Sequence, residues 1–337
     1  MTEKTDSTAD GIGLDAISDL ASEAAAGIPA PIRNSFFKAF GQLCAAAVDV
    51  PVSYLEGKAA ENRAESSARV ALIKVNEQQI ARQMSVSLAY VQAASEKFSK
   101  KIVREQVNLD DIVKIASDDI RSKAERLELP NDDEGVTISD DWLNAFEREA
   151  VQKSSDEMKL LFGKVLSGEI RKPSSFSIRT LKLLSQLDHQ TANLFHKLCS
   201  LSVSLRFGDY VHEARVISLN GNAAQNSLQG YGLGFDSLNV LNECGLIISD
   251  YNSYMDYRFA LANGGTVALP MTYIGRPHGL VAIDQTNHGE LKLNGVAFTK
   301  SGKELLSIVD ITHDEKYTAD LAAFFNSRKL KFVEIKT

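Results

Sequence analysis

Apolar residues recur at helical spacing through residues 58–129, a stretch with neither glycine nor proline. They lie three, four or seven positions apart at Ile73, Ile80, Met84, Leu88, Val91, Phe98 and Ile102. This period predicts long α-helices that bury one face, in an antiparallel hairpin or an oligomer. The face is rich in Ala, Ser and Gln, which favours packing in a bundle over an independent coiled coil. Asn108 or Asp110 is expected to cap a further helix that stops before Pro130.

A polar, acidic segment at residues 130–141 carries Pro and Gly at turn positions and predicts a linker. Four short amphipathic helices are expected after it, over residues 140–152, 154–168, 176–187 and 189–205. Ser154 and Glu157 have the spacing of a capping box, Gly168 is expected to end the second helix, and Asp188 to cap the fourth. The short loops between them are typical of a compact helical bundle.

The composition of the chain changes after Arg206, where 13 of the 21 glycines and several runs rich in strand-forming residues are found. A predicted helix ending near Gly245 runs into a strand, and residues 295–309 predict a strand, a turn and a helix. This order resembles the winged-helix layout, with a long insertion in place of the wing. We therefore expect a predominantly α, α+β protein with four regions: a mobile acidic tail (1–27), a long helical region (28–130), a short-helix bundle (131–205) and a winged-helix-like domain (206–337).

Charge argues against a general nucleic-acid-binding surface, because the chain has a net charge of −7. Residues 206–337 hold 12 basic and 14 acidic residues, a net of −2, which leaves few cations for phosphate contacts. The helix that would read DNA in a winged-helix domain, residues 235–245, contains neither Lys nor Arg. A protein partner for this domain is therefore favoured, while a local DNA-binding patch stays open.

The nearest candidate for a membrane span is residues 36–55, from Phe36 to Leu55, which Lys38, Asp49 and Pro51 interrupt. Core packing is the favoured interpretation of this stretch, and peripheral membrane contact is the alternative. The acidic start of the chain lacks the pattern of a secretory or transit peptide. The only cysteines, Cys44, Cys199 and Cys244, form no disulfide or zinc pattern, so we expect a cytoplasmic protein.

Arg171, Lys172, Ser174 and Ser175 lie in the turn between two predicted helices. Two cations beside the free amides of a helix start could bind an anion. The same residues suit a plain helical corner, in which cations complement one helix end and serines cap the next. We favour the structural interpretation and keep anion binding as the alternative.

No motif for a cofactor or a metal emerges from the sequence. The glycine-rich run at residues 230–234 lacks the spacing of a phosphate-binding loop, and the six histidines show no metal-binding spacing. Glu290 with Lys292 and Glu334 with Lys336 each place an acid and a lysine two residues apart on a predicted strand. This is the pattern of Mg²⁺-dependent nucleases, but neither pair has an evident partner carboxylate.

Residues 138–195, with upstream segments at 28–40, 50–66 and 100–116, resemble an uncharacterised bacterial family, domain of unknown function 2806. The resemblance covers most of residues 28–330 and brings no reaction or catalytic residue. A more distant similarity to the abortive-infection alpha proteins implies a role in defence against phage. We therefore expect a non-enzymatic, homo-oligomeric effector with a protein partner, and keep a nuclease and a membrane-surface effector as alternatives.

Overall fold

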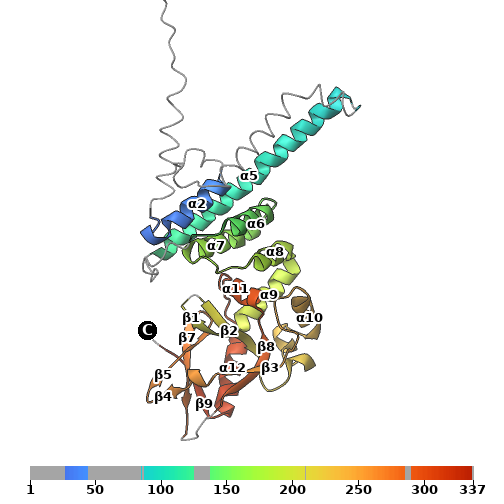
Figure 1. Ribbon diagram of the computed structural model, residues 1–337. Coiled ribbons are helices and arrows are strands. Elements are labelled where there is room, and N and C mark those ends of the chain that lie inside the picture. Colours follow the sequence, from blue (N-terminus) through green and yellow to red (C-terminus); the bar gives the residue numbers. More distant parts are fainter. Residues whose placement is uncertain are drawn as a thin grey trace, which may run out of the picture. The chain divides into compact units, whose positions relative to one another are not determined.

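The computed structural model describes residues 27–44, 85, 87–124, 137–208, 210–284 and 290–335 (Figure 1). The chain divides into two compact units, residues 1–178 and 179–337. This division differs from the expected boundary at residue 205, because the short helices predicted as one bundle are shared between two cores. The expected acidic tail, most of the expected linker, and the positions Ile73, Ile80 and Met84 lie outside the described residues.

Unit 1 is helical in the part that the structure describes. Its elements are η1 (Ala30–Ile32), α2 (Arg33–Leu43), α5 (Leu88–Ala124), α6 (Asp140–Ala150) and α7 (Asp156–Arg171). α5 and α7 pack along each other, and α2 contacts α5, α6 and α7. Phe36, Ile112, Phe146 and Phe162 are fully buried among them, because each helix turns its apolar stripe toward the same core.

The long helix α5 runs without a break through Asn108 and Asp110, so the cap predicted at these residues is wrong. Asn108 instead donates a hydrogen bond from Nδ2 to the carbonyl of Val151, 2.9 Å away, and is 5% exposed. An asparagine whose side chain bonds to another element has no reason to end its own helix. The second half of α5 forms the core, with Leu109, Ile112 and Ile120 at 3% exposure or less.

The predicted bounds of α7 need correction at both ends. Ser155, one residue after the predicted Ser154, accepts a hydrogen bond from the amide of Met158 and caps the helix. The helix also passes through Gly168 and ends at Arg171. Gly168 does not terminate the helix but makes room for an aromatic ring, since a Cβ there would lie 2.6 Å from Cε2 of Phe176.

Unit 2 combines helices with a sheet. The helices are α8 (Ile178–Gln186, at the boundary), α9 (His189–Leu201), α10 (Phe235–Glu243), α11 (Lys300–Leu306) and α12 (Glu315–Ser327). The strands are β1 (Val203–Phe207), β2 (Tyr210–Ile217), β3 (Ser253–Asp256), β4 (Ala262–Asn263), β5 (Thr266–Val267), β6 (Met271–Tyr273), β7 (Arg276–Ala282), β8 (Lys292–Ala297) and β9 (Leu330–Glu334). The cap predicted at Asp188 is confirmed, because its carboxylate accepts from the amide of Thr191 at 2.7 Å.

The main sheet of unit 2 is antiparallel, with the order β3-β8-β2-β1-β6-β7-β9. α9 and α11 contact β2, while α12 contacts β9 (Figure 1). Tyr273, Tyr317 and Phe325 are buried inside, and the Tyr317 hydroxyl donates to the carbonyl of Ile217 at 3.1 Å. The α+β class predicted from the sequence is therefore confirmed, with the helices of unit 1 before the sheet of unit 2.

Candidate functional site

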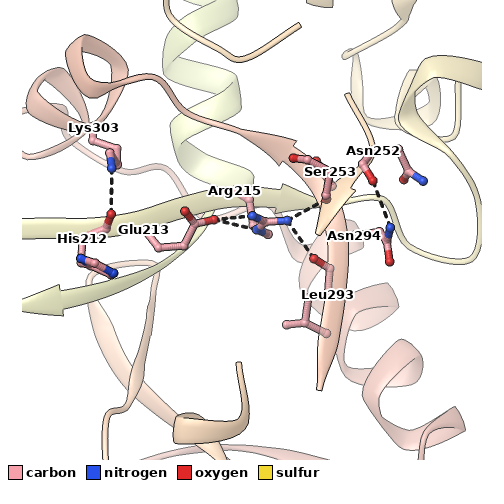
Figure 2. Close-up of polar contacts among 9 residues, drawn as sticks. His212, Glu213, Arg215, Asn252, Ser253, Leu293, Asn294 and Lys303 are labelled. Atoms are coloured by element: carbon pink, nitrogen blue, oxygen red, sulfur yellow. Dashed lines mark hydrogen bonds and ion pairs between the residues drawn. The ribbon is translucent and has the colours of Figure 1, made fainter. Parts of the chain in front are cut away.

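A buried arginine joins three strands of unit 2 (Figure 2). Arg215 of β2 is 2% exposed and donates from Nη1 to the carbonyls of Ser253 in β3 and Leu293 in β8, each at 2.8 Å. Its Nη2 lies 2.6 Å from Oε1 of Glu213. Because these partners occupy the guanidinium, the arrangement fixes the strands and leaves Arg215 with no free face for a substrate.

Tyr257 fills the interior next to this ion pair. Its side chain is fully buried, and its hydroxyl has no hydrogen-bond partner among the described residues. Burial, with a further contribution from the charge of Glu213, raises the pKa of Tyr257 far above its usual range. The phenol is therefore neutral at neutral pH, and in this form it cannot serve as a general base.

The predicted pair Glu290 and Lys292 lies at the start of β8. The Lys292 Nζ is 2.9 Å from the Glu290 carboxylate and 5.0 Å from the centre of the Tyr254 ring. In the register of β3 and β8, Asp256 lies opposite Lys292. The fold thus brings a second acid beside the predicted pair, which sequence reasoning missed because only the strand register reveals it.

Asp256 and Glu290 are already engaged by groups of the protein. Burial alone would raise the pKa of Asp256, but hydrogen bonds from the Arg258 side chain and from the amides of Leu291 and Arg258 outweigh it and lower this pKa. The hydrogen bond to Glu290 raises the pKa of Lys292. Among the residues that the structure describes, no group of three His, Cys, Asp or Glu side chains could hold a metal ion.

The other predicted pair is separate from this one. Glu334 lies on β9 and forms an exposed ion pair with Arg276 of β7 at 3.2 Å, while Lys336 lies outside the described residues. Glu334 also lies at the end of β9 that is opposite to Arg328, the residue whose side chain reaches Lys292 of β8. Glu290 and Glu334 therefore do not belong to one two-carboxylate site.

The turn for which anion binding was kept as the alternative is occupied by a side chain of the protein itself. Glu169, which is 2% exposed, accepts hydrogen bonds from the amides of Ser174 at 2.6 Å and Phe176 at 2.9 Å. The Ser175 hydroxyl donates to the carbonyl of Lys172, the residue that follows Arg171 at the end of α7. These two amides, which would face an external anion under the anion-binding alternative, are thus hydrogen-bonded within the protein. Glu169, five residues before Ser174, was the signal in the sequence for this internal hydrogen bonding.

A family match spans both units described above. The model of the family described as Protein of unknown function (DUF2806) matches residues 92–322, from the first half of α5 into α12. The chain belongs to this family. Comparisons with curated proteins and with solved structures find no match.

The glycine-rich run of this DUF2806 protein borders a polar depression of about 590 Å³ at the start of α10. Gly232, Gly234, Asn226 and Asp236 are among its lining residues. The amide of Phe235 is bonded to Oδ1 of Asn226 at 2.7 Å, and Asp236 adds a negative charge. A phosphate would meet an occupied amide and a repelling carboxylate, so the depression lacks the features of a phosphate cradle.

The apolar stretch at residues 36–55 contributes to the core of unit 1 as far as the structure describes it. Phe36, Phe40 and Leu43 are at most 8% exposed, and residues 45–55 lie outside the described residues. No helix in the described part of the chain has both the length and the hydropathy needed to span a membrane.

Proposed function

We propose that this DUF2806 protein is a non-enzymatic interaction protein that self-associates through the first half of α5. The observation that carries the proposal is a run of large exposed apolar side chains between residues 88 and 107 of this helix, a stretch in which Val91 is buried. Leu88, Tyr90, Phe98, Val103 and Val107 are 39%, 65%, 43%, 63% and 50% exposed. Large apolar side chains gathered on one exposed helical segment are typical of a protein–protein contact.

The apolar face of α5 continues from its buried half into its exposed half. Phe98 and Ile102 are related to Leu109 and Ile112 by steps of three, four and seven residues, so all four side chains lie along one side of the helix. At the usual rise per residue, α5 is about 55 Å long. α7 packs against the second half of α5. A second copy of α5 would cover the first half in the same way.

A partner-binding role for unit 2 is the second part of the proposal. The order β3-β8-β2, with α10 before β3 and α11 after β8, supports the resemblance to a winged helix. α10 carries Asp236 and Glu243 and no cation, which favours a protein over DNA as its partner.

The test is the mass of the full chain at micromolar concentration, measured by light scattering after size exclusion. We expect a defined oligomer, and a shift of at least about tenfold toward the monomer in Phe98→Glu, because a buried unpaired carboxylate opposes the contact. Gln92→Glu, which adds the same charge at an exposed polar position of α5, is the matched control. A monodisperse wild-type monomer would overturn the proposal.

The setting we propose is bacterial defence against phage, which rests on the similarity to abortive-infection alpha proteins alone. Cells that express the chain should show fewer plaques than cells with an empty vector. Phe98→Glu should lose this protection if self-association is required. Equal plaque numbers on expressing cells and on cells with an empty vector, for a broad set of phages, would exclude the role in phage defence. This result would not affect the test of self-association.

A Mg²⁺-dependent nuclease is the second candidate, because Asp256 lies opposite Lys292 and beside Glu290. An Mg²⁺ ion would have to displace Arg258 and Lys292 from these carboxylates. The test is cleavage of single- and double-stranded DNA and RNA with Mg²⁺. Cleavage that persists unchanged in Asp256→Asn and Glu290→Gln would exclude this site.

A further inference from the structure

Four strand ends of unit 2 meet at one corner of its sheet. Asp256 at the end of β3 lies opposite Lys292 at the start of β8. Val281, near the end of β7, lies opposite Lys331, near the start of β9. A bridge between Leu261 and Leu280 joins the segment after β3 to β7.

Hydrogen bonds tie the segments of this corner together. Nη1 of Arg328, in the turn before β9, donates to the carbonyl of Lys292 at 3.1 Å. The amide of Ile283 donates to the carbonyl of Lys329 at 2.9 Å. We call the exposed side chains here, Phe259, Val281, Ile283, Lys292, Arg328 and Lys329, the corner surface.

The corner surface presents large apolar side chains to solvent. Phe259 is 55% exposed, Val281 43% and Ile283 57%, and the neighbouring Tyr254 is 58% exposed. Single exposed apolar residues are common on proteins, but a cluster of this size next to charged residues is typical of a binding surface.

Charged side chains of both signs surround these apolar side chains, and the exposed Asp284 directly follows Ile283. Lys292 and Arg258 pair with Glu290 and Asp256. Among the described residues no ion pair joins the exposed Lys329 or Lys331 to a carboxylate, while the Arg328 guanidinium lies 4.2 Å from the centre of the Phe324 ring and donates to the carbonyl of Lys292. The corner therefore has cations that remain available to an anionic partner, although the chain as a whole has a net charge of −7.

We infer that the corner surface docks on an anionic lipid membrane. Phe259 and Tyr254 could stack on a nucleotide base, but Val281 and Ile283 have no aromatic face, so two of the four exposed apolar side chains would contribute little to binding nucleic acid. A bilayer interface accommodates both groups, because apolar side chains enter the acyl boundary while lysines and arginines meet anionic headgroups. Tyr254 has the amphipathic ring that is enriched at this depth.

The test is co-sedimentation of the full chain with vesicles of phosphatidylcholine alone or with about one third phosphatidylserine. We expect binding only to the anionic vesicles. The double variant Lys329→Gln/Lys331→Gln should weaken it by about fivefold per charge removed. Val281→Ser/Ile283→Ser should also weaken it, whereas the exposed controls Lys300→Gln and Leu160→Ser should bind as the wild type does.

Several outcomes would overturn the inference. These are no binding to anionic vesicles, equal loss in the control variants, or binding that neither double variant changes. A different result would assign the surface to nucleic acid instead. In that case the wild type would bind a single-stranded oligonucleotide tightly but would not bind vesicles, and Lys329→Gln/Lys331→Gln would lose the oligonucleotide binding. Circular dichroism of each variant checks that the fold is retained. Phe98→Glu separates this inference from the proposed self-association, since a monomer should still prefer anionic vesicles.

Discussion

Glu169 is the residue on which the corner between α7 and α8 depends. Its carboxylate satisfies two backbone amides in a position where water has little access. Glu169→Ala would leave the buried amide of Phe176 and the part-buried amide of Ser174 without this acceptor, so we expect a loss of about 3 kcal/mol in the free energy of unfolding. Urea unfolding followed by circular dichroism measures this loss.

The matched variant for this prediction is Glu169→Gln, which keeps the shape and one acceptor oxygen. It should lose less stability than Glu169→Ala, because a neutral acceptor still bonds one amide. If Glu169→Ala unfolded within about 0.5 kcal/mol of the wild type, the carboxylate would not be the group that holds the turn.

His278 should make the stability of unit 2 depend on pH. It is 7% exposed, stacks on Phe332 with ring centres 4.4 Å apart, and faces the carbonyl of Arg276 and the register partner Glu334. Burial lowers the pKa of His278 below its ordinary value, although the Arg276 carbonyl and Glu334 oppose the shift. The neutral ring is therefore the form that the folded state favours.

Because the folded pKa lies below the unfolded value, the unfolded chain binds the proton first as pH falls. The stabilisation is complete above about pH 6.5 and is lost as the pH drops through the folded pKa. Urea unfolding between pH 8 and pH 5 should show a smaller loss in His278→Gln than in the wild type. The exposed His212→Gln should follow the wild type, and an identical slope in all three proteins would contradict the assignment.

At the scale of elements, α5 and α7 approach each other at a glycine. A Cβ on Gly163 would lie 2.5 Å from Cγ2 of Ile115, closer than the two helices can tolerate without a shift. Gly163→Ala should therefore cost about 1–3 kcal/mol, even though alanine is the better helix former. Thermal unfolding measures the effect, and adding Ile115→Ala should cost less than the sum of the single changes.

The helices of this fold could be predicted largely from local signals. The apolar period identified α5 and α7, and the cap at Asp188 follows from an acid just before an apolar run. The errors arose where a tertiary contact outweighed the local signal. Asn108 looked like a cap but bonds to Val151, and Gly168 looked like a helix end but makes room for Phe176.

The sheet and the charged positions on it depend on pairing between distant segments. Nothing in the local sequence places Asp256 opposite Lys292, or Arg328 against the carbonyl of Lys292. The sequence did identify Glu290 and Lys292 as a pair, because they lie two residues apart at the start of one strand. A strand register is set by the whole sheet, so such partners emerge only with the fold.

At the scale of the whole molecule, each unit has its own core, and a local defect should stay within its unit. Arg215→Met would leave Glu213 half-buried without its cation and free two carbonyls, at a cost of about 3–5 kcal/mol. Hydrogen exchange should accelerate in β2, β3 and β8 and remain unchanged in α5 and α7. Arg215→Met/Glu213→Leu should recover part of the loss, and faster exchange throughout unit 1 would show that the two cores are not independent.

The two outer strands of the main sheet are short, with four residues in β3 and five in β9. Lys331 lies within β9, and Lys329 and Arg328 directly precede it. Short edge strands with nearby lysines discourage a second chain from pairing its backbone with the edge of the sheet. Such edge pairing is the first step toward β-sheet aggregates. The proposed assembly through the first half of α5 would benefit from such protection, because copies of the chain could then meet without pairing through their sheets.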